Sequence, residues 1–178
     1  MKIKLVITVL LLYISQLTIA QIDFDVNVLN QEVYDSTLDN NIMLGKFDVE
    51  GMKNAKVFKR SMKVGKKYSP NTEIFVPGGV TVNNLQITIV MGSWCPDSQL
   101  EVPKMIMILE AIDYPMDMLE IIAVNRWKKV PEMNISSLNI KYVPTFIFYK
   151  EGVEVGRIVE TPKQSLEFDM VNILNKIQ

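Results

Sequence analysis

Hydrophobic and polar positions follow two different periods along the second half of the chain. Residues 85–92 (LQITIVMG) and 118–125 (MLEIIAVN) are continuous apolar runs rich in β-branched side chains, a pattern typical of strands buried on both faces of a sheet. Residues 145–150 and 153–160 predict two further strands, and the short link between them predicts an antiparallel hairpin. Apolar positions at helical spacing predict a helix from residue 96 to about residue 112.

The last segment of the chain predicts a second helix. Thr161 is its expected N-cap, Pro162 its first residue, and Gln164 the partner of Thr161 in a capping box. The predicted order is therefore strand, helix, strand, loop, strand, strand, helix. That order predicts an α/β domain over residues 80–178, in which a mixed central sheet is flanked by helices on both faces.

Residues 21–79 lack this regularity, and we expect them to form a mainly helical N-terminal extension. A helix is predicted around residues 50–68, and VPGGV at 76–80 predicts a turn that closes the extension. Residues 53–67 hold seven basic residues and no acidic one. This basic stretch indicates either the solvated face of an amphipathic helix or a surface attracted to an anionic partner or lipid.

Residues 1–20 have the layout of a secretory signal peptide. Two lysines, Lys2 and Lys4, precede an apolar run that ends in small residues, which predicts cleavage after Ala20. A retained membrane anchor is the alternative, although the run is short and interrupted by Ser15 and Gln16. We therefore expect an exported protein, periplasmic or secreted, with no stable membrane insertion after cleavage. Export would place it in an oxidising compartment.

Composition excludes several classes of function. With 48% hydrophobic and 22% charged residues, the chain of 178 residues can bury a core without a metal or a disulfide. A net charge of −1 gives no sign of a nucleic-acid partner. The absence of histidine excludes Ser-His and Cys-His catalysis and the common histidine metal sites. We expect no metal or other cofactor.

A copper site is the minor alternative to that expectation. Cysteine and methionine sulfur atoms are soft ligands that bind Cu(I). The candidate ligands are Cys95, Met105, Met107, Met116 and Met118. Met105 belongs to the apolar stripe of the predicted helix, so core packing is the simpler explanation for it.

The only cysteine lies in GSWCPDSQLEVPK, residues 92–104. With Pro96 at the first helical position, Cys95 is the expected N-cap, where its sulfur can accept hydrogen bonds from the amides of Asp97 and Ser98. The positive helix end favours the thiolate, the nucleophile of disulfide exchange, whereas the Asp97 carboxylate opposes it. An inert buried cysteine is the alternative. A position beside Trp94 at a strand-to-helix turn favours a reactive thiol.

Several short motifs, in this order and spacing, resemble the thioredoxin-like superfamily, and in particular an exported bacterial branch with a single-cysteine Trp-Cys-x-Asp-Ser motif. The matching features are the Trp94-Cys95 turn after a buried strand, a kink proline at Pro103, the cis-proline loop Val143-Pro144-Thr145, and the hairpin glycine Gly152. The resemblance covers residues 80–178. It implies a thioredoxin fold over that range, preceded by the extension.

Two departures from the dithiol pattern of that superfamily change the predicted reaction. Ser98 stands where a second, resolving cysteine would be, and Ile89 stands where thioredoxins carry a buried acid. A serine cannot form a disulfide, but its hydroxyl can donate a hydrogen bond to the Cys95 thiolate. Autonomous dithiol reduction is therefore not expected. A thiol from outside the chain would have to complete any reaction cycle.

The resemblance also implies a substrate contact surface around the cysteine. If Pro144 is cis, the backbone of Val143 would pair with an extended substrate segment. Glu160 is either a further contact residue or a solvated carboxylate at a strand end. The full set of predicted contact residues is Trp94, Pro96, Asp97, Val143, Pro144 and Glu160.

Two hypotheses about function follow. In the first, Cys95 carries out thiol–disulfide exchange with a protein or low-molecular-weight thiol or disulfide, and Ser98 supports its thiolate; these two are the predicted catalytic residues. In the second, the fold is a non-catalytic binding module that holds a partner segment in the cis-proline cleft. Replacing Cys95 separates the two, because only the first hypothesis needs the thiol.

Overall fold

The structure is a computed structural model that describes residues 24–75, 82 and 84–176. The predicted signal peptide and the VPGGV turn therefore lie outside the described residues. Within the described part of the chain, no helix is long and apolar enough to cross a membrane.

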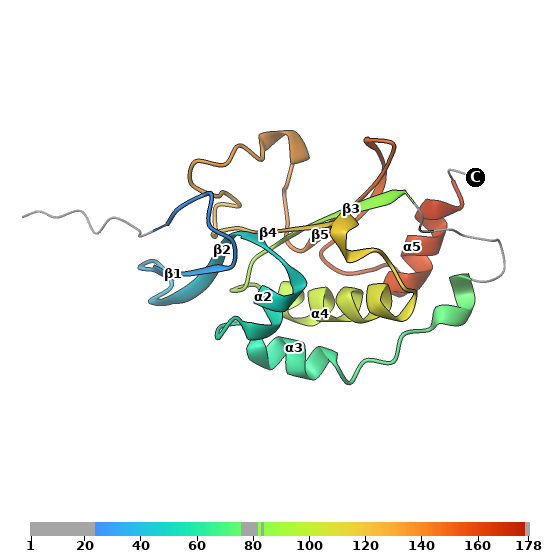
Figure 1. The fold of residues 1–178 in the computed structure, drawn as a ribbon, viewed down its shortest axis with the longest axis horizontal. Coiled ribbons are helices and arrows are strands. Elements are labelled where there is room, and N and C mark those ends of the chain that lie inside the picture. Colours follow the sequence, from blue (N-terminus) through green and yellow to red (C-terminus); the bar gives the residue numbers. More distant parts are fainter. Residues whose placement is uncertain (1–23, 76–81, 83, 177–178) are drawn as a thin grey trace, which may run out of the picture.

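Six strands form one mixed sheet in the order β1-β2-β4-β3-β5-β6 (Figure 1). β3 and β4 run parallel, and every other neighbouring pair runs antiparallel. The four predicted strands are confirmed, with ends that differ by at most two residues, and the link between the last two is a tight turn in which Glu151 and Gly152 have positive φ. The strand bounds are β1 Gln31–Asp35, β2 Asn40–Phe47, β3 Leu85–Met91, β4 Leu119–Ala123, β5 Thr145–Lys150 and β6 Val153–Val159.

The prediction of a mainly helical N-terminal extension is wrong, because residues 31–47 form a β-hairpin. β2 pairs with β4, with Phe47 opposite Ile121, so the extension continues the central sheet. In β1 the side chains of Val33 and Asp35 are buried and that of Tyr34 is exposed, as expected of a strand with one face against the core. The alternation in QEVYD was the available sequence signal for this strand.

The helix predicted around residues 50–68 forms in two short pieces, α2 (Val49–Asn54) and α3 (Lys59–Gly65). Ala55 leaves the helical region at φ −57° and ψ 123°. The backbone amides that follow, those of Lys56 and Val57, donate to the Glu32 carboxylate at 2.7 and 3.0 Å. A carboxylate of β1 therefore takes the amides that a continuous helix would have used internally.

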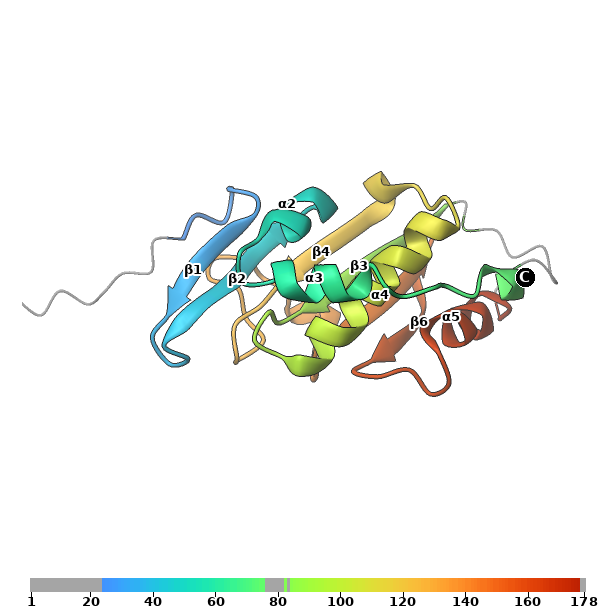
Figure 2. The same cartoon turned by 90° about the horizontal axis from the view of Figure 1, so that it is seen from below.

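Strand side chains alternate between two faces that have different covers. On one face, α2, α3, α4 (Pro96–Ala111) and α5 (Leu166–Leu174) all contribute buried side chains to a single hydrophobic cluster (Figure 2). We call this the helix-covered face. The prediction of helices on both faces is wrong. Among the residues that the structure describes, the hydrophobic cluster on the opposite face contains no side chain from within an α-helix.

The opposite face is covered by the β4–β5 loop, residues 124–144, which is drawn in orange in Figure 1. We call it the loop-covered face. The loop contains one 3-10 turn, Ser136–Leu138. Its apolar side chains pack over Val90 of β3 and Ile122 of β4. Those loop side chains are Val130, Met133, Ile135, Leu138 and Ile140.

The last helix begins later than predicted. α5 starts at Leu166, and its N-cap is Ser165, whose hydroxyl accepts the Phe168 amide at 3.1 Å. The Lys163 amide instead donates to the Asp169 carboxylate at 2.6 Å. Residues 161–164 therefore form a turn before the helix rather than its first turn.

The extension is joined to α5 through Glu167, whose residue exposure is 1%. Its carboxylate accepts the Tyr68 hydroxyl at 2.8 Å and the Asn71 amide at 3.1 Å. Burial acts to raise the pKa of Glu167, but backbone amides and the Tyr68 hydroxyl donate to the ionised form and hold the pKa below its ordinary value. Burial is the largest cause that raises the pKa of Tyr68 to about 12, and the hydrogen bond to the Glu167 carboxylate adds to it.

Candidate functional site

Cys95 lies at the N-cap of α4, as predicted. It has extended backbone angles, φ −90° and ψ 124°, and Pro96 follows at the start of the helix. The expectation that its sulfur accepts amide hydrogen bonds of the first turn is wrong, since the side chain makes no capping hydrogen bond. Instead the thiol donates to the carbonyl oxygen of Val143 at 3.1 Å. The contact joins the two segments that the sequence singled out.

The peptide bond between Val143 and Pro144 is cis, as predicted from the resemblance. The Pro144 carbonyl accepts the Glu160 amide at 2.7 Å, so the end of β6 lies against this loop. The Thr145 hydroxyl donates to the Tyr142 carbonyl at 2.7 Å and closes the loop from inside. Within the described residues, the amide of Val143 donates no hydrogen bond. That amide therefore has no hydrogen-bond partner among the described residues, although Val143 itself is buried.

Ser98 is buried one turn into α4, with no exposed surface. Its hydroxyl accepts the Gly92 amide at 3.2 Å. The expected hydrogen bond from Ser98 to the Cys95 sulfur is not formed. In this arrangement Ser98 joins the end of β3 to the start of α4, and so it positions the turn that carries the thiol.

Trp94 is half-buried and held from both sides. Its indole Nε1 donates to the Val124 carbonyl at 2.9 Å, and the Arg126 guanidinium lies 5.9 Å from the ring centroid. A Cβ at Gly92 would lie 2.6 Å from the Trp94 ring, so this approach requires glycine. Trp94 thus links the cysteine turn to the β4–β5 loop.

The predicted contact residues differ in exposure. Pro96 is exposed, whereas Asp97 and Glu160 are half-buried. The residue exposure of Cys95 is 8%. It belongs to the hydrophobic cluster of the loop-covered face, together with Val90, Val124, Val130 and Val143. The thiol is therefore nearly covered on the loop-covered face.

Sequence reasoning missed a pocket of about 480 Å³ on the other side of Trp94. The extension forms one wall and the cysteine turn the other, so the pocket depends on the hairpin that the helical prediction did not include. Ser93 anchors the two walls, because its hydroxyl accepts the Met43 amide at 2.9 Å and its carbonyl accepts the Gln99 side chain at 2.7 Å. The lining residues are Leu38, Asn40, Asn41, Ile42, Lys56, Val57, Ser93, Trp94 and Gln99.

The soft ligands of the copper alternative do not converge. Cys95 belongs to the cluster of the loop-covered face, whereas Met105 is fully buried in the cluster of the helix-covered face. Met107, Met116 and Met118 also pack against the helix-covered cluster. No group of three or more Cys, Asp or Glu side chains in the described residues could hold a metal ion. Core packing accounts for these methionines.

Comparison with known proteins gives no family. No protein-family model and no curated protein matches the chain. One similar solved structure is a protein of unknown function from Pseudomonas aeruginosa, with 12% identity and a TM-score of 0.49, covering 73% of this chain and 90% of that chain. Another is an HIV epitope scaffold, with 14% identity and a TM-score of 0.42, covering 66% of this chain and 72% of that chain. The mixed α/β fold with its six-stranded sheet is shown by the chain's own structure, and the function has to be argued from its own site.

Proposed function

We propose that the chain is a thioredoxin-like protein that uses Cys95 for single-thiol exchange with a disulfide. One observation carries the proposal: the thiol lies 3.1 Å from the carbonyl of Val143, the residue that precedes a cis-proline. This contact brings a helix N-cap cysteine against a backbone segment whose amide donates no hydrogen bond within the described residues. A substrate segment added at that amide would lie beside the sulfur.

The strand order supports the fold part of the proposal. β3 and β4 are parallel neighbours connected through α4, while β5 and β6 form an antiparallel hairpin next to β3. α5 then follows β6. The resemblance predicts the same order. The hairpin β1–β2 extends this sheet at the edge formed by β4.

The reaction needs one thiol from the chain and a second from outside. The Cys95 S–H bond breaks and its proton passes to solvent. The sulfur then attacks one sulfur of the substrate disulfide, forms a new S–S bond, and releases the other substrate sulfur as a thiolate. An external thiol next attacks this mixed disulfide and frees Cys95. The external thiol is oxidised and the chain returns to its starting state.

Two buried residues explain why the chain does not resolve the mixed disulfide itself. Ser98 has no sulfur, and its hydroxyl is used by the Gly92 amide. Ile89 is fully buried in the cluster of the helix-covered face, so no acid occupies that position. The mixed disulfide therefore persists until an external thiol arrives. Export, proposed from residues 1–20, would supply an oxidising compartment in which substrate disulfides occur.

The reaction can be tested with dithiodipyridine, an uncharged disulfide whose released thiol absorbs light. We expect one equivalent to be released by the folded protein, at a higher rate than by the same chain unfolded in urea, because the folded chain would hold the disulfide beside the sulfur. The Cys95→Ser variant should release none, and the exposed Glu73→Gln serves as a control. Slower release from the folded than from the unfolded chain would show an inert buried cysteine.

The binding-module alternative rests on the Val143 amide, which donates no hydrogen bond within the described residues, and it makes a different prediction. If the thiol is incidental, the Cys95→Ser variant keeps both partner binding and phenotype in the native host. Under the exchange proposal, acid quenching of host cells that express the wild-type chain traps disulfide-linked adducts at Cys95. Absence of such adducts, together with full function of Cys95→Ser, would select the binding module.

A further inference from the structure

The β4–β5 loop forms a pocket of about 470 Å³, which has no role in the exchange reaction as proposed so far. Its volume lies within the range of about 300–1,000 Å³ that is typical of small-molecule sites. Val130, which lines it, belongs to the same hydrophobic cluster as Cys95 and Val143. Lys141, on another wall, lies two residues before Val143 in the chain. The lining therefore includes the segment that leads into the cis-proline loop.

The charged side chains of the pocket are all basic. Lys128, Lys129 and Lys141 line it, and no acidic residue does. None of the three takes part in an ion pair with any residue that the structure describes. Trp127, also in the lining, is 62% exposed. A concave site with three unneutralised ammonium groups and a free indole favours an anionic ligand that has a flat apolar part.

One wall of the pocket is a turn held by Asn125. The Asn125 amide donates to the Lys129 carbonyl at 3.1 Å, and its carbonyl accepts the Lys128 amide at 2.9 Å. Its side-chain oxygen accepts the amides of Trp127 and Lys129 at 3.0 and 3.1 Å. These four hydrogen bonds fix the backbone that carries Trp127, Lys128 and Lys129 before any ligand binds. Pre-organisation of this kind lowers the entropic cost of binding.

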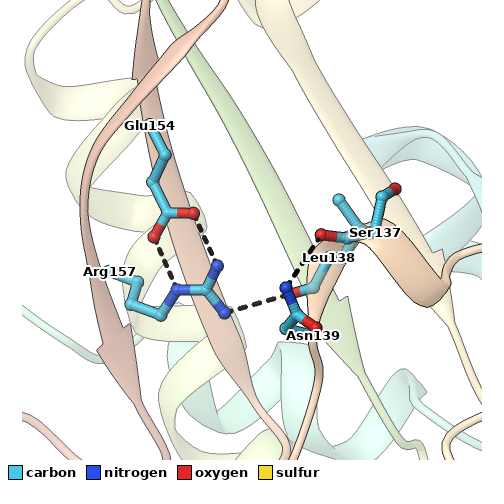
Figure 3. Close-up of polar contacts among 5 residues, drawn as sticks. All are labelled: Ser137, Leu138, Asn139, Glu154 and Arg157. Atoms are coloured by element: carbon cyan, nitrogen blue, oxygen red, sulfur yellow. Dashed lines mark hydrogen bonds and ion pairs between the residues drawn. The ribbon is translucent and has the colours of Figure 1, made fainter.

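The facing wall is the 3-10 turn, which β6 holds in place (Figure 3). Arg157 donates to the Leu138 carbonyl at 3.0 Å and makes two hydrogen bonds of 2.6 Å each to the Glu154 carboxylate. The Asn139 side chain donates to the Ser137 carbonyl at 3.3 Å and stabilises the same turn. Because Glu154 neutralises Arg157, the bridge anchors the wall without adding charge to the pocket.

We propose that this pocket selects the disulfide substrate and that the substrate is a low-molecular-weight disulfide carrying anionic groups. The inference rests on the proposed exchange at Cys95. The lysines would hold the anionic groups while one substrate sulfur reaches the thiol past Val143. Cys95 loses its proton to solvent and forms the mixed disulfide. The other half of the substrate leaves as a thiolate that keeps its anionic group.

Binding is tested apart from chemistry in the Cys95→Ser variant, which has no thiol. Calorimetry with dithiobis(nitrobenzoate), an aromatic disulfide with two carboxylates, should show binding that weakens at least about tenfold when Lys128, Lys129 and Lys141 are changed together to Gln. A matched variant changes Lys59 and Lys63 of α3 and its C-cap Lys66 to Gln. It loses the same charge on the helix-covered side and should bind as before. No binding, or equal loss in both variants, overturns the inference.

Selectivity is tested in the chain that keeps its thiol. The rate with dithiobis(nitrobenzoate) should fall at least about tenfold in the pocket variant and should fall with added salt, while the rate with uncharged dithiodipyridine stays unchanged. If both rates respond equally to the lysine changes, the pocket does not select charge and the inference is overturned, although exchange stands. If neither disulfide releases a thiol from the wild-type chain, the proposed exchange fails, and the calorimetry still decides whether the pocket binds anions.

Discussion

The two faces of the sheet are built from the same strands but have different covers. On the helix-covered face, apolar side chains of four α-helices pack against β2, β3, β4 and β5. On the loop-covered face, the cover is a loop whose turns are held by Asn125, Asn134 and Arg157 through polar contacts. Cys95 and the basic pocket both belong to the loop-covered face. The candidate chemistry therefore lies where the cover depends least on buried apolar area.

This difference separates stability from access. Opening the helix-covered face would expose a large apolar cluster and amounts to unfolding, whereas the β4–β5 loop can open locally at a lower free energy. If the loop opens in this way, a nearly covered thiol is compatible with reaction, because opening the loop alone would expose it.

The largest expected effect comes from neighbouring residues of β4 that point to opposite faces. Ile121 is 1% exposed on the helix-covered face and Ile122 is 3% exposed on the loop-covered face. We expect Ile121→Ala to lower the free energy of unfolding by an amount near the top of the range of about 2–5 kcal/mol, and Ile122→Ala by an amount near its bottom, because the loop can settle into the cavity. Urea unfolding measures both. Equal losses would mean that the loop is as rigid a cover as the helices.

A smaller effect is expected from Glu167, which belongs to the helix-covered side. Because its pKa is lower in the folded chain than the ordinary value of 4.5, its contribution to stability is complete above about pH 5 and is lost as the pH falls through the folded value. We expect Glu167→Gln to cost about 1 kcal/mol at pH 7 and to flatten the acid side of the stability profile. The exposed Glu73→Gln serves as control. Parallel acid profiles for wild type and Glu167→Gln would contradict the prediction.

The smallest change in stability is expected for Arg157→Met, which removes the link between β6 and the 3-10 turn. A partly exposed ion pair contributes only about 0–1 kcal/mol, so the unfolding midpoint should hardly move. The amides of Leu138 and Asn139 should nevertheless exchange their hydrogens faster, because the turn loses its anchor. Lys46→Met breaks a comparable pair with Glu120 without touching the loop and should leave these amides unchanged. Unaltered exchange in Arg157→Met would show that the turn holds itself.

The three interior strands β3, β4 and β5 could be predicted from the sequence because they are largely buried. Continuous apolar runs such as LQITIVM carry that information locally. The hairpin of the extension could not be predicted as easily, since β1 and β2 mix polar and apolar residues and β2 is specified by its pairing with β4. The start of α5 was misplaced for a related reason, because the Asp169 carboxylate takes the Lys163 amide that a helix beginning at Thr161 would need.

The candidate site was predictable where it depends on neighbours in sequence. The N-cap position of Cys95 follows from Pro96, and the cis-proline follows from the resemblance. The hydrogen bond of the thiol could not be predicted from the sequence, because its acceptor, the Val143 carbonyl, comes from a segment far along the chain. The role of Ser98 changed in the same way once the Gly92 amide was found at its hydroxyl.

The pairing of Gly45 with Ala123 also affects the order in which the chain can assemble. The β1–β2 hairpin leaves the ribosome early, but the strand that completes its pairing is synthesised much later, after β3 and α4. A nascent chain therefore carries an unpaired strand edge for the time needed to make the intervening residues. Pairing between distant segments of this kind slows folding, and an edge left open invites contacts with other chains. The sheet can therefore be completed on the extension's side only after β4 has been synthesised.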